Sequence, residues 1–151
     1  MLKRLRAYLR LRKAQKYSQK GKISEAINEL ENLLSFNPNY HFAYFHLGCL
    51  LKKKRELEKA KNAFLKAIEL APKNSVYYTF IGILHYEYKL YEEANDFFKK
   101  SLDLDSNNSL TYNYLALCHL AKGNTDEFKK IIKEKGIFES IDFQINLILI
   151  L

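Results

Sequence analysis

The sequence predicts an all-α protein built from about four helix pairs, with a further helix at its C-terminal end. Two observations carry this prediction. The chain repeats at an offset of 34 residues, and the apolar residues inside each repeat recur every three or four positions, as on one face of a helix. A third observation agrees: the 151 residues include only five glycines and two prolines, which leaves few turns for a many-stranded sheet.

The repetition is visible when the chain is aligned with itself. Pro38 and Pro72 lie 34 residues apart, and four columns of similar side chains follow the same offset. The columns are Ala26, Ala60 and Ala94; Leu30, Phe64, Phe98 and Ile132; Phe36, Leu70, Leu104 and Phe138; and Tyr44, Tyr78 and Tyr112. One helix pair cannot bury its own apolar face, whereas stacked pairs share a continuous core.

Each repeat is expected to hold two helices and a short turn. The candidate turns contain Gly21, Asn37–Pro38, Pro72–Asn74, Ser106–Asn108 and Gly123. The repeats are predicted at residues 7–40, 41–74, 75–108 and 109–138, followed by a capping or tail helix at 139–151, all in one domain spanning 1–151.

Gly48 and Gly82 fall inside predicted helices, where each costs about 1 kcal/mol relative to alanine. Close approach of the second helix of the same pair explains their presence. We expect Phe64 and Phe98 to fill the space beside them, next to the small face made by the alanine column.

The repeat pattern resembles that of the tetratricopeptide repeat family over about residues 7–138. The second and third repeats carry the resemblance, through Tyr44, Leu47, Gly48, Ala60, Phe64, Ala67 and Pro72, and through Tyr78, Ile81, Gly82, Ala94 and Phe98. The end repeats depart from the pattern: Arg10 and Lys13 stand at the positions of Tyr44 and Leu47, Phe128 stands in the alanine column, and Lys135 stands in the column of Ala67. Divergent end repeats are expected because their outer faces meet water.

The resemblance implies a right-handed α-solenoid, a superhelix in which the first helix of each pair lines a concave groove that binds a peptide or a helix. The predicted peptide-binding residues on this face are Tyr8, Leu11, Phe42, Phe45, His46, Cys49, Val76, Phe80, Ile83, Tyr86, Tyr114 and Leu117. The same face is expected to carry Arg12, Gln15, Thr79, Leu110, Asn113 and Leu120.

The character of this face favours an apolar ligand. The best-known use of the family is to clamp an acidic C-terminal tail with basic and amide side chains, and the matching positions here hold Leu11, Gln15, His46, Val76 and Phe80. We therefore predict a protein-interaction module, a scaffold, adaptor or escort, that takes an apolar helix or an extended peptide. The alternative is that the aromatic side chains only fill the core of the array.

Positive charge is concentrated at the N-terminal end. The chain has a net charge of +8, with nine basic residues and no acidic residue in 1–22, so the remainder carries 16 basic and 17 acidic groups. Contact with a membrane surface or with a polyanion such as nucleic acid is an alternative function for this segment. A solvated outer face of the first repeat is the simpler explanation.

The C-terminal end is uncharged and apolar from Phe143 onward. Residues Ile145, Leu147, Ile148, Leu149 and Leu151 could cap the array, enter the groove of this chain or of a second copy, or contact a membrane or another protein. Self-association through this segment is therefore a third hypothesis, which would make the protein a self-assembling structural unit.

Catalysis is not expected. No serine, cysteine or histidine lies in a nucleophile motif, and no glycine-rich loop is present to hold a phosphate. Cys49 and Cys118 are expected to be reduced thiols, and neither a metal site nor a cofactor is predicted. Without a signal peptide or a segment of about 20 apolar residues, we expect a cytoplasmic protein.

Overall fold

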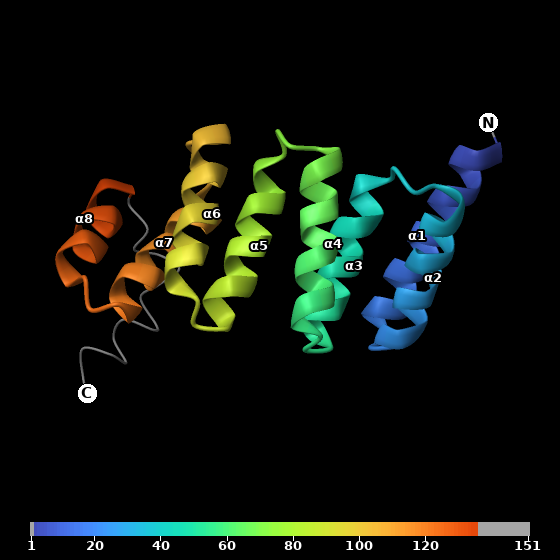
Figure 1. The fold of residues 1–151 in the computed structure, drawn as a ribbon, viewed down its shortest axis with the longest axis horizontal. Helices are drawn as coiled ribbons and strands as arrows, with labels where there is room; N and C mark the ends of the chain where they lie inside the picture. The colour runs from blue at the N-terminus through green and yellow to red at the C-terminus, as the bar shows by residue number, and fades with distance from the viewer. Residues whose placement is uncertain (1, 136–151) are drawn as a thin grey trace. The chain divides into compact units, whose positions relative to one another are not determined.

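The computed structural model describes residues 2–135, which form eight helices and no strand (Figure 1). The helices are α1 (Leu2–Gln19), α2 (Ile23–Phe36), α3 (His41–Lys53), α4 (Leu57–Leu70), α5 (Ser75–Glu87), α6 (Tyr91–Leu104), α7 (Ser109–Ala121) and α8 (Thr125–Lys135). The all-α repeat fold is therefore confirmed. The predicted helix at 139–151 lies outside the described residues, and with it the proposed self-association residues of the C-terminal end.

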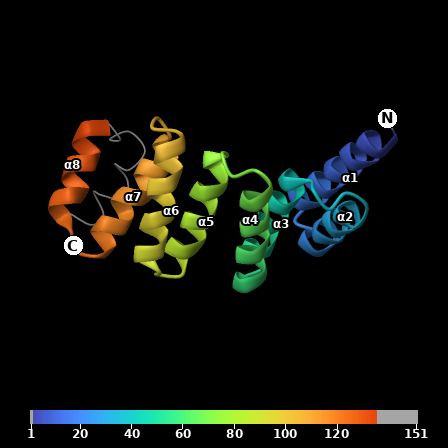
Figure 2. The same cartoon turned by 45° about the horizontal axis from the view of Figure 1, so that its top comes forward.

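The chain divides into two compact units, residues 1–81 and residues 82–151. Helix α5 contributes its first half to the first unit and its second half to the second. In the first unit α1 packs against α2, α2 against α3, and α3 against α4 (Figures 1 and 2). In the second unit α6 packs against α7 and α7 against α8.

Two of the four repeating columns, those of Ala26 and of Leu30, lie in the core, whereas Leu104 in the column of Phe36 is 43% exposed. Ala26, Ala60 and Ala94 are completely buried, and so are Phe64 and Phe98. In the second unit Ala94 and Phe98 belong to one cluster with the buried side chains of α7 and α8, among them Ala116 and Ile132. These two columns are thus contact positions between helices.

The two helical glycines mark a close approach, as predicted. A Cβ atom built on Gly48 would lie 2.7 Å from Cε1 of Phe64, and one on Gly82 would lie 2.5 Å from Cε1 of Phe98. Real Cβ contacts are essentially never this short. Each phenylalanine ring therefore occupies the space that a larger residue would need, which explains why both repeats accept the cost of a glycine inside a helix.

The turns inside the helix pairs share one backbone conformation. Gly21, Arg55, Lys89 and Gly123 follow each other at the 34-residue offset, and all four have positive φ angles, of 72°, 63°, 63° and 78°. The left-handed region is readily accessible to glycine and costs other residues about 1–2 kcal/mol. The middle repeats therefore carry a small backbone strain that the end repeats avoid.

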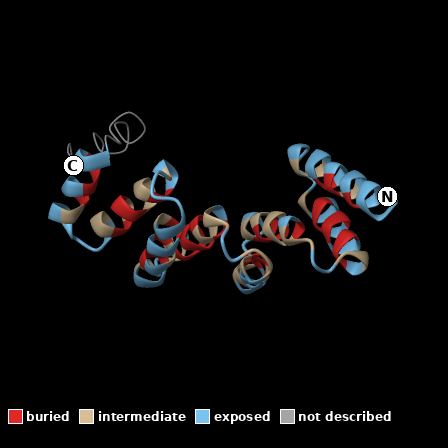
Figure 3. Cartoon of the chain, turned by 90° about the horizontal axis from the view of Figure 1, so that it is seen from above, coloured by how far each residue is buried: buried red, intermediate tan, exposed pale blue. Residues whose placement is uncertain are grey.

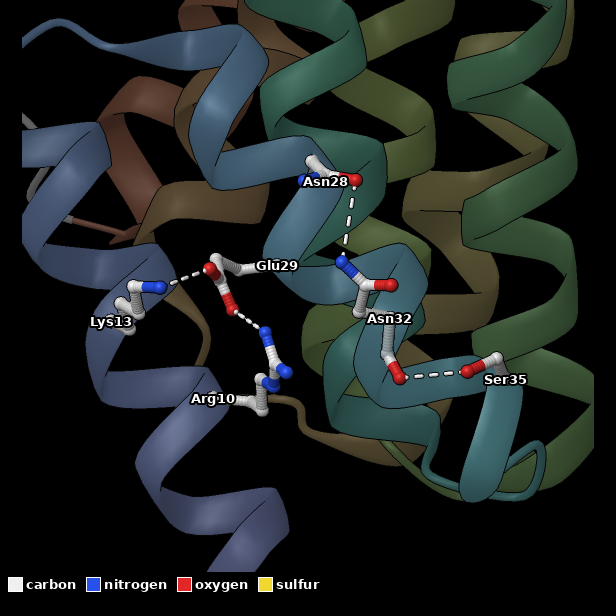
Figure 4. Close-up of polar contacts among 6 residues, drawn as sticks. All are labelled: Arg10, Lys13, Asn28, Glu29, Asn32 and Ser35. Atoms are coloured by element: carbon white, nitrogen blue, oxygen red, sulfur yellow. Dashed lines mark hydrogen bonds and ion pairs between the residues drawn. The ribbon is translucent and has the colours of Figure 1, made fainter.

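An ion-pair network replaces part of the apolar contact in the first helix pair (Figure 4). Glu29 on α2 is buried, and its carboxylate accepts hydrogen bonds from Arg10 at 2.5 Å and from Lys13 at 2.6 Å, both on α1. Burial acts to raise the pKa of Glu29, but the hydrogen bonds from Lys13 and Arg10 and their charges outweigh it and lower that pKa.

The network accounts for the departure of the first repeat from the family pattern. Arg10 and Lys13 stand where the second repeat has Tyr44 and Leu47, and Glu29 stands where it has the buried Ala63. The two cations and their buried acid thus occupy three contacting positions of the same seam.

Candidate functional site

The first helices of the repeats provide the predicted binding face, and in the first unit this face contains a hollow. The hollow has a volume of about 390 Å³ and lies between α1 and α3, with Leu30 of α2 at its base. Its lining residues are Leu11, Ala14, Gln15, Ser18, Gln19, Leu30, His46, Cys49, Leu50 and Lys53. Apolar side chains and amide or hydroxyl groups are mixed in this lining, and Lys53 is its one charged residue.

An aromatic cluster adjoins the hollow along α3 and the first half of α5. Phe42 meets the ring of His46 edge to face, with ring centroids 4.5 Å apart. Phe45 stacks on Tyr77 at 5.0 Å and meets Phe80 edge to face at the same centroid distance. Offset-stacked and edge-to-face pairs of this kind are the favoured geometries of aromatic side chains.

The predicted residues of the first unit differ in exposure. Tyr8, Phe42 and Val76 are exposed, at 52%, 38% and 42%. Phe45, His46, Cys49 and Phe80 are partly buried. Leu11 is buried at 8% exposure, although its side chain still lines the hollow. The face therefore combines exposed apolar side chains with others that support them from beneath.

His46 brings an unused polar atom to this face. Its Nε2 atom is buried and has no hydrogen-bond partner within the described residues. Burial lowers the pKa of His46 below its ordinary value of 6.5, so the ring is neutral at physiological pH and carries one donor and one acceptor nitrogen.

Neither cysteine is poised as a nucleophile. Burial raises the pKa of the Cys49 thiol to about 11, and burial does the same for Cys118. At neutral pH both are almost entirely protonated, whereas the thiolate is the reactive form. Within residues 2–135 no three His, Cys, Asp or Glu side chains come together as a metal site would require.

The predicted residues of the second unit mostly pack against one another. Ile83 is buried at 5% exposure within the core cluster. Tyr86 and Tyr114 meet edge to face at 5.5 Å, and Tyr114 also stacks on Phe98 at 6.1 Å. Leu117 is partly buried. Much of the aromatic surface in this unit therefore serves as core.

Tyr77 is a member of the aromatic cluster that the sequence interpretation missed. It is almost completely buried, and its hydroxyl lies 2.6 Å from Nδ1 of His41 at the start of α3. Its column holds Ala43 and Thr111, which are also buried, so the column marks a seam between consecutive helix pairs. The three positions share no residue type in the sequence, so no periodic signal marked Tyr77 as part of that seam.

Sequence profiles of the tetratricopeptide repeat match residues 7–40 and 43–74, and a second profile of the same repeat matches residues 97–127. The chain belongs to the tetratricopeptide repeat family. Tetratricopeptide repeats are non-catalytic protein-interaction modules. A comparison with curated proteins finds no match for this tetratricopeptide repeat chain.

Solved structures agree with the fold. A crystal structure of MamA is 21% identical, covers 91% of this chain and 81% of its own, and has a TM-score of 0.80. PilF of Pseudomonas aeruginosa is 20% identical, with coverages of 89% and 62% and a TM-score of 0.80. The first tetratricopeptide repeat domain of Spaghetti (RPAP3), bound to the HSP90 peptide SRMEEVD, is 21% identical, with coverages of 79% and 94% and a TM-score of 0.74.

Identities this low establish the shared fold and leave the ligand open. No helix in residues 2–135 of this tetratricopeptide repeat protein is long and apolar enough to cross a membrane.

Proposed function

We propose that the first unit binds an apolar helix or extended segment of another protein across α1, α3 and the first half of α5. The exposed side chains of Phe42 on α3 and Val76 on α5 carry this proposal together with the hollow between α1 and α3, which Phe42 adjoins through its contact with His46. Apolar side chains of the partner would enter the hollow and cover Phe42 and Val76, as anchors do in helix-in-groove recognition.

The polar side chains of this face favour a peptide, which has hydrogen-bonding groups, over a ligand made only of hydrocarbon. His46 Nε2 is buried without a partner, and Gln15, Ser18 and Gln19 line the same hollow. The amide and hydroxyl groups of Gln15, Ser18 and Gln19 are accessible and would exchange hydrogen bonds with the backbone of a bound peptide. Binding a peptide at this face would thus combine apolar burial with hydrogen bonds to these side chains.

Charge argues against an acidic tail as the ligand. Lys53 is the one cationic side chain that lines the hollow, and the exposed Phe42 and Val76 are uncharged. The peptide SRMEEVD, seen with the RPAP3 domain, has two adjacent glutamates and an aspartate at its end. We expect this peptide to bind here weakly or not at all.

The test uses peptides selected on the full chain from a displayed library that contains both apolar helical and acidic-tailed sequences. Affinities are then measured by fluorescence anisotropy for the wild type, for Phe42→Glu and for Val76→Glu. Each substitution is expected to lower the affinity for an apolar peptide by at least about tenfold, because the new carboxylate would have to be buried against the peptide. Leu65→Glu is the matched control, since Leu65 is equally exposed, at 39%, on the second helix α4.

Phe45 and Phe80 are poorer targets for this test. Phe45 contacts Phe64, Tyr77 and Phe80, so its truncation would also disturb the core. The proposal fails if selection enriches acidic tails such as SRMEEVD. It fails equally if apolar peptides bind Phe42→Glu and Val76→Glu as tightly as the wild type.

A further inference from the structure

The outer edge of α1 carries a second apolar surface, on the side opposite its buried contacts. Leu2, Leu5 and Leu9 are exposed at 83%, 53% and 57%. They border a hollow of about 430 Å³ whose other lining residues are Arg6, Arg10 and Lys13. Figure 3 shows the helix that begins at N mostly in pale blue, which marks exposed residues. We call Leu2, Leu5 and Leu9 the leucine edge.

The leucine edge continues as a row of lysines. With about 3.6 residues per turn, Leu2, Leu5 and Leu9 fall on one face of α1, and Lys13 and Lys16 extend the same face toward its C-terminal end. Lys20 follows in the turn directly after the helix. The buried residues Ala7, Leu11 and Ala14 lie on the other side. The face is therefore apolar in its first half, basic in its second, and free of acidic residues.

In the later repeats the equivalent positions are buried where one helix pair packs on the preceding pair. Leu9 corresponds to Ala43 and Tyr77, which are buried at 0% and 1% exposure. Lys16 corresponds to Leu50, which is buried at 6%. An apolar helix stacked on α1 as one repeat stacks on the next would thus bury Lys16 without a partner, and such a charge is too costly to bury unpaired.

Several basic side chains near the leucine edge form no ion pair within the described residues. Lys3, Arg4, Lys16 and Lys20 form no ion pair within the part of the chain that the structure describes, whereas Arg10 and Lys13 bind Glu29. A second copy that docks through its own leucine edge would bring the same positive charges and would be repelled. A negatively charged occupant that accepts leucine side chains matches both features of this edge.

We propose that the leucine edge and its lysine row dock on an anionic lipid membrane. The hollow beside the leucines is walled by residues of α1 alone, so it lacks the second element that would form a groove for a partner helix. A single protruding helix with apolar side chains and a basic continuation instead fits the interface between headgroups and acyl chains. The lysines face the anionic headgroups while the leucines enter the interface.

Vesicle co-sedimentation with the full chain tests the docking. We expect binding to phosphatidylcholine vesicles that contain one-third phosphatidylserine, and little binding to pure phosphatidylcholine. A basic residue near an anionic surface strengthens binding by about fivefold. Lys16→Glu with Lys20→Glu should therefore weaken binding by more than about tenfold. The matched control, Lys99→Glu with Lys100→Glu, makes the same charge change on exposed positions of α6 and should have a smaller effect.

Substitution of the leucines distinguishes insertion into the membrane from general electrostatic attraction to a polyanion. Leu5→Ser with Leu9→Ser keeps every charge and should weaken vesicle binding by about tenfold or more. The same variant should bind heparin and duplex DNA as the wild type does. If it binds vesicles as the wild type does, or if DNA proves the tighter ligand of the wild type, the membrane proposal is wrong.

A local reporter decides which part of the chain enters the lipid. The sequence has no tryptophan, so Leu9→Trp introduces a single one at the leucine edge. Its emission should shift to the blue with anionic vesicles and be quenched by brominated lipid. Leu65→Trp, at an exposed position of α4, should show neither change. An unshifted Leu9→Trp on a protein that still sediments would place the contact elsewhere and overturn the proposal, and circular dichroism confirms that each variant is folded.

Discussion

The first and second helix pairs lie in the same unit and use equivalent positions of the 34-residue repeat, yet different chemistry holds them together. The second pair has Tyr44 and Leu47 on α3 and Ala63 on α4, whereas at the equivalent positions the first pair joins α1 to α2 through Arg10, Lys13 and the buried Glu29. Equivalent positions between the two helices are apolar in the second pair and form an ion-pair network in the first. The first pair therefore carries its polar groups beside the exposed leucines of α1.

A second difference concerns how closely the two helices approach. In the second pair Gly48 faces the ring of Phe64, and in the first pair the corresponding residues are Ala14 and Leu30. The pairing recurs elsewhere, since Gly82 faces Phe98 while Ala116 accompanies Ile132. A flat aromatic ring in this chain goes with glycine, and a smaller aliphatic side chain goes with alanine.

The largest expected effect comes from exchanging these combinations. Gly48→Ala should lower the free energy of unfolding by about 2 kcal/mol, because its Cβ would lie 2.7–3.0 Å from three atoms of a completely buried ring. This loss is net of the roughly 1 kcal/mol that alanine gains over glycine inside a helix. Denaturant unfolding monitored by circular dichroism measures it.

The control reproduces the first pair within the second. Gly48→Ala combined with Phe64→Leu should recover part of the loss, because leucine accompanies alanine in the first pair without a clash. If Gly48→Ala is as stable as the wild type, or if the added leucine substitution makes it worse by the full cost of a core truncation, the proposed size matching is wrong.

The ion-pair network gives the next largest effect. Glu29→Ala leaves Arg10 and Lys13 without their acid and should cost about 1–2 kcal/mol, less than for a fully buried network because both cations are partly exposed and regain water. Converting the first pair to the chemistry of the second, by Arg10→Tyr, Lys13→Leu and Glu29→Ala together, should restore stability to the wild-type level or above. Equal stability of Glu29→Ala and the wild type would show that the network contributes nothing.

The network also predicts a dependence on pH. Because the pKa of Glu29 is lowered in the folded state, its contribution is fully present above the unfolded value of about 4.5 and is lost as the pH falls through the lower folded value. The wild type should therefore lose stability relative to the triple variant below about pH 4.5. Glu56, whose pKa of about 2 is set by hydrogen bonds from Lys54 and Lys59, titrates in both proteins and cancels in the comparison.

These differences show which features the sequence could reveal. The columns predicted the helix pairs and the contact of Gly48 with Phe64, because both depend on periodic apolar residues. They flagged Arg10 and Lys13 as departures, but not Glu29 as their partner, since an acid far along the chain gives no periodic signal. The predicted binding face followed from the family register and stays a prediction. The contact of Tyr77 with Phe45 depends on packing between consecutive pairs, which no single column describes.

The smallest expected effect concerns the turns, where the sequence signal was incomplete. Gly21 and Gly123 were recognisable as breaks, but Arg55 in the same column was not, because arginine does not indicate a positive φ angle. Arg55→Gly should raise the free energy of unfolding by about 0.5–1 kcal/mol, as relief of the left-handed strain exceeds the added flexibility of the unfolded chain. Gly21→Ala in the first pair should lower the free energy of unfolding by about 1 kcal/mol. Thermal unfolding of the two variants decides the matter: if both shift in the same direction, the two turns do not share the conformation that makes the helix pairs equivalent.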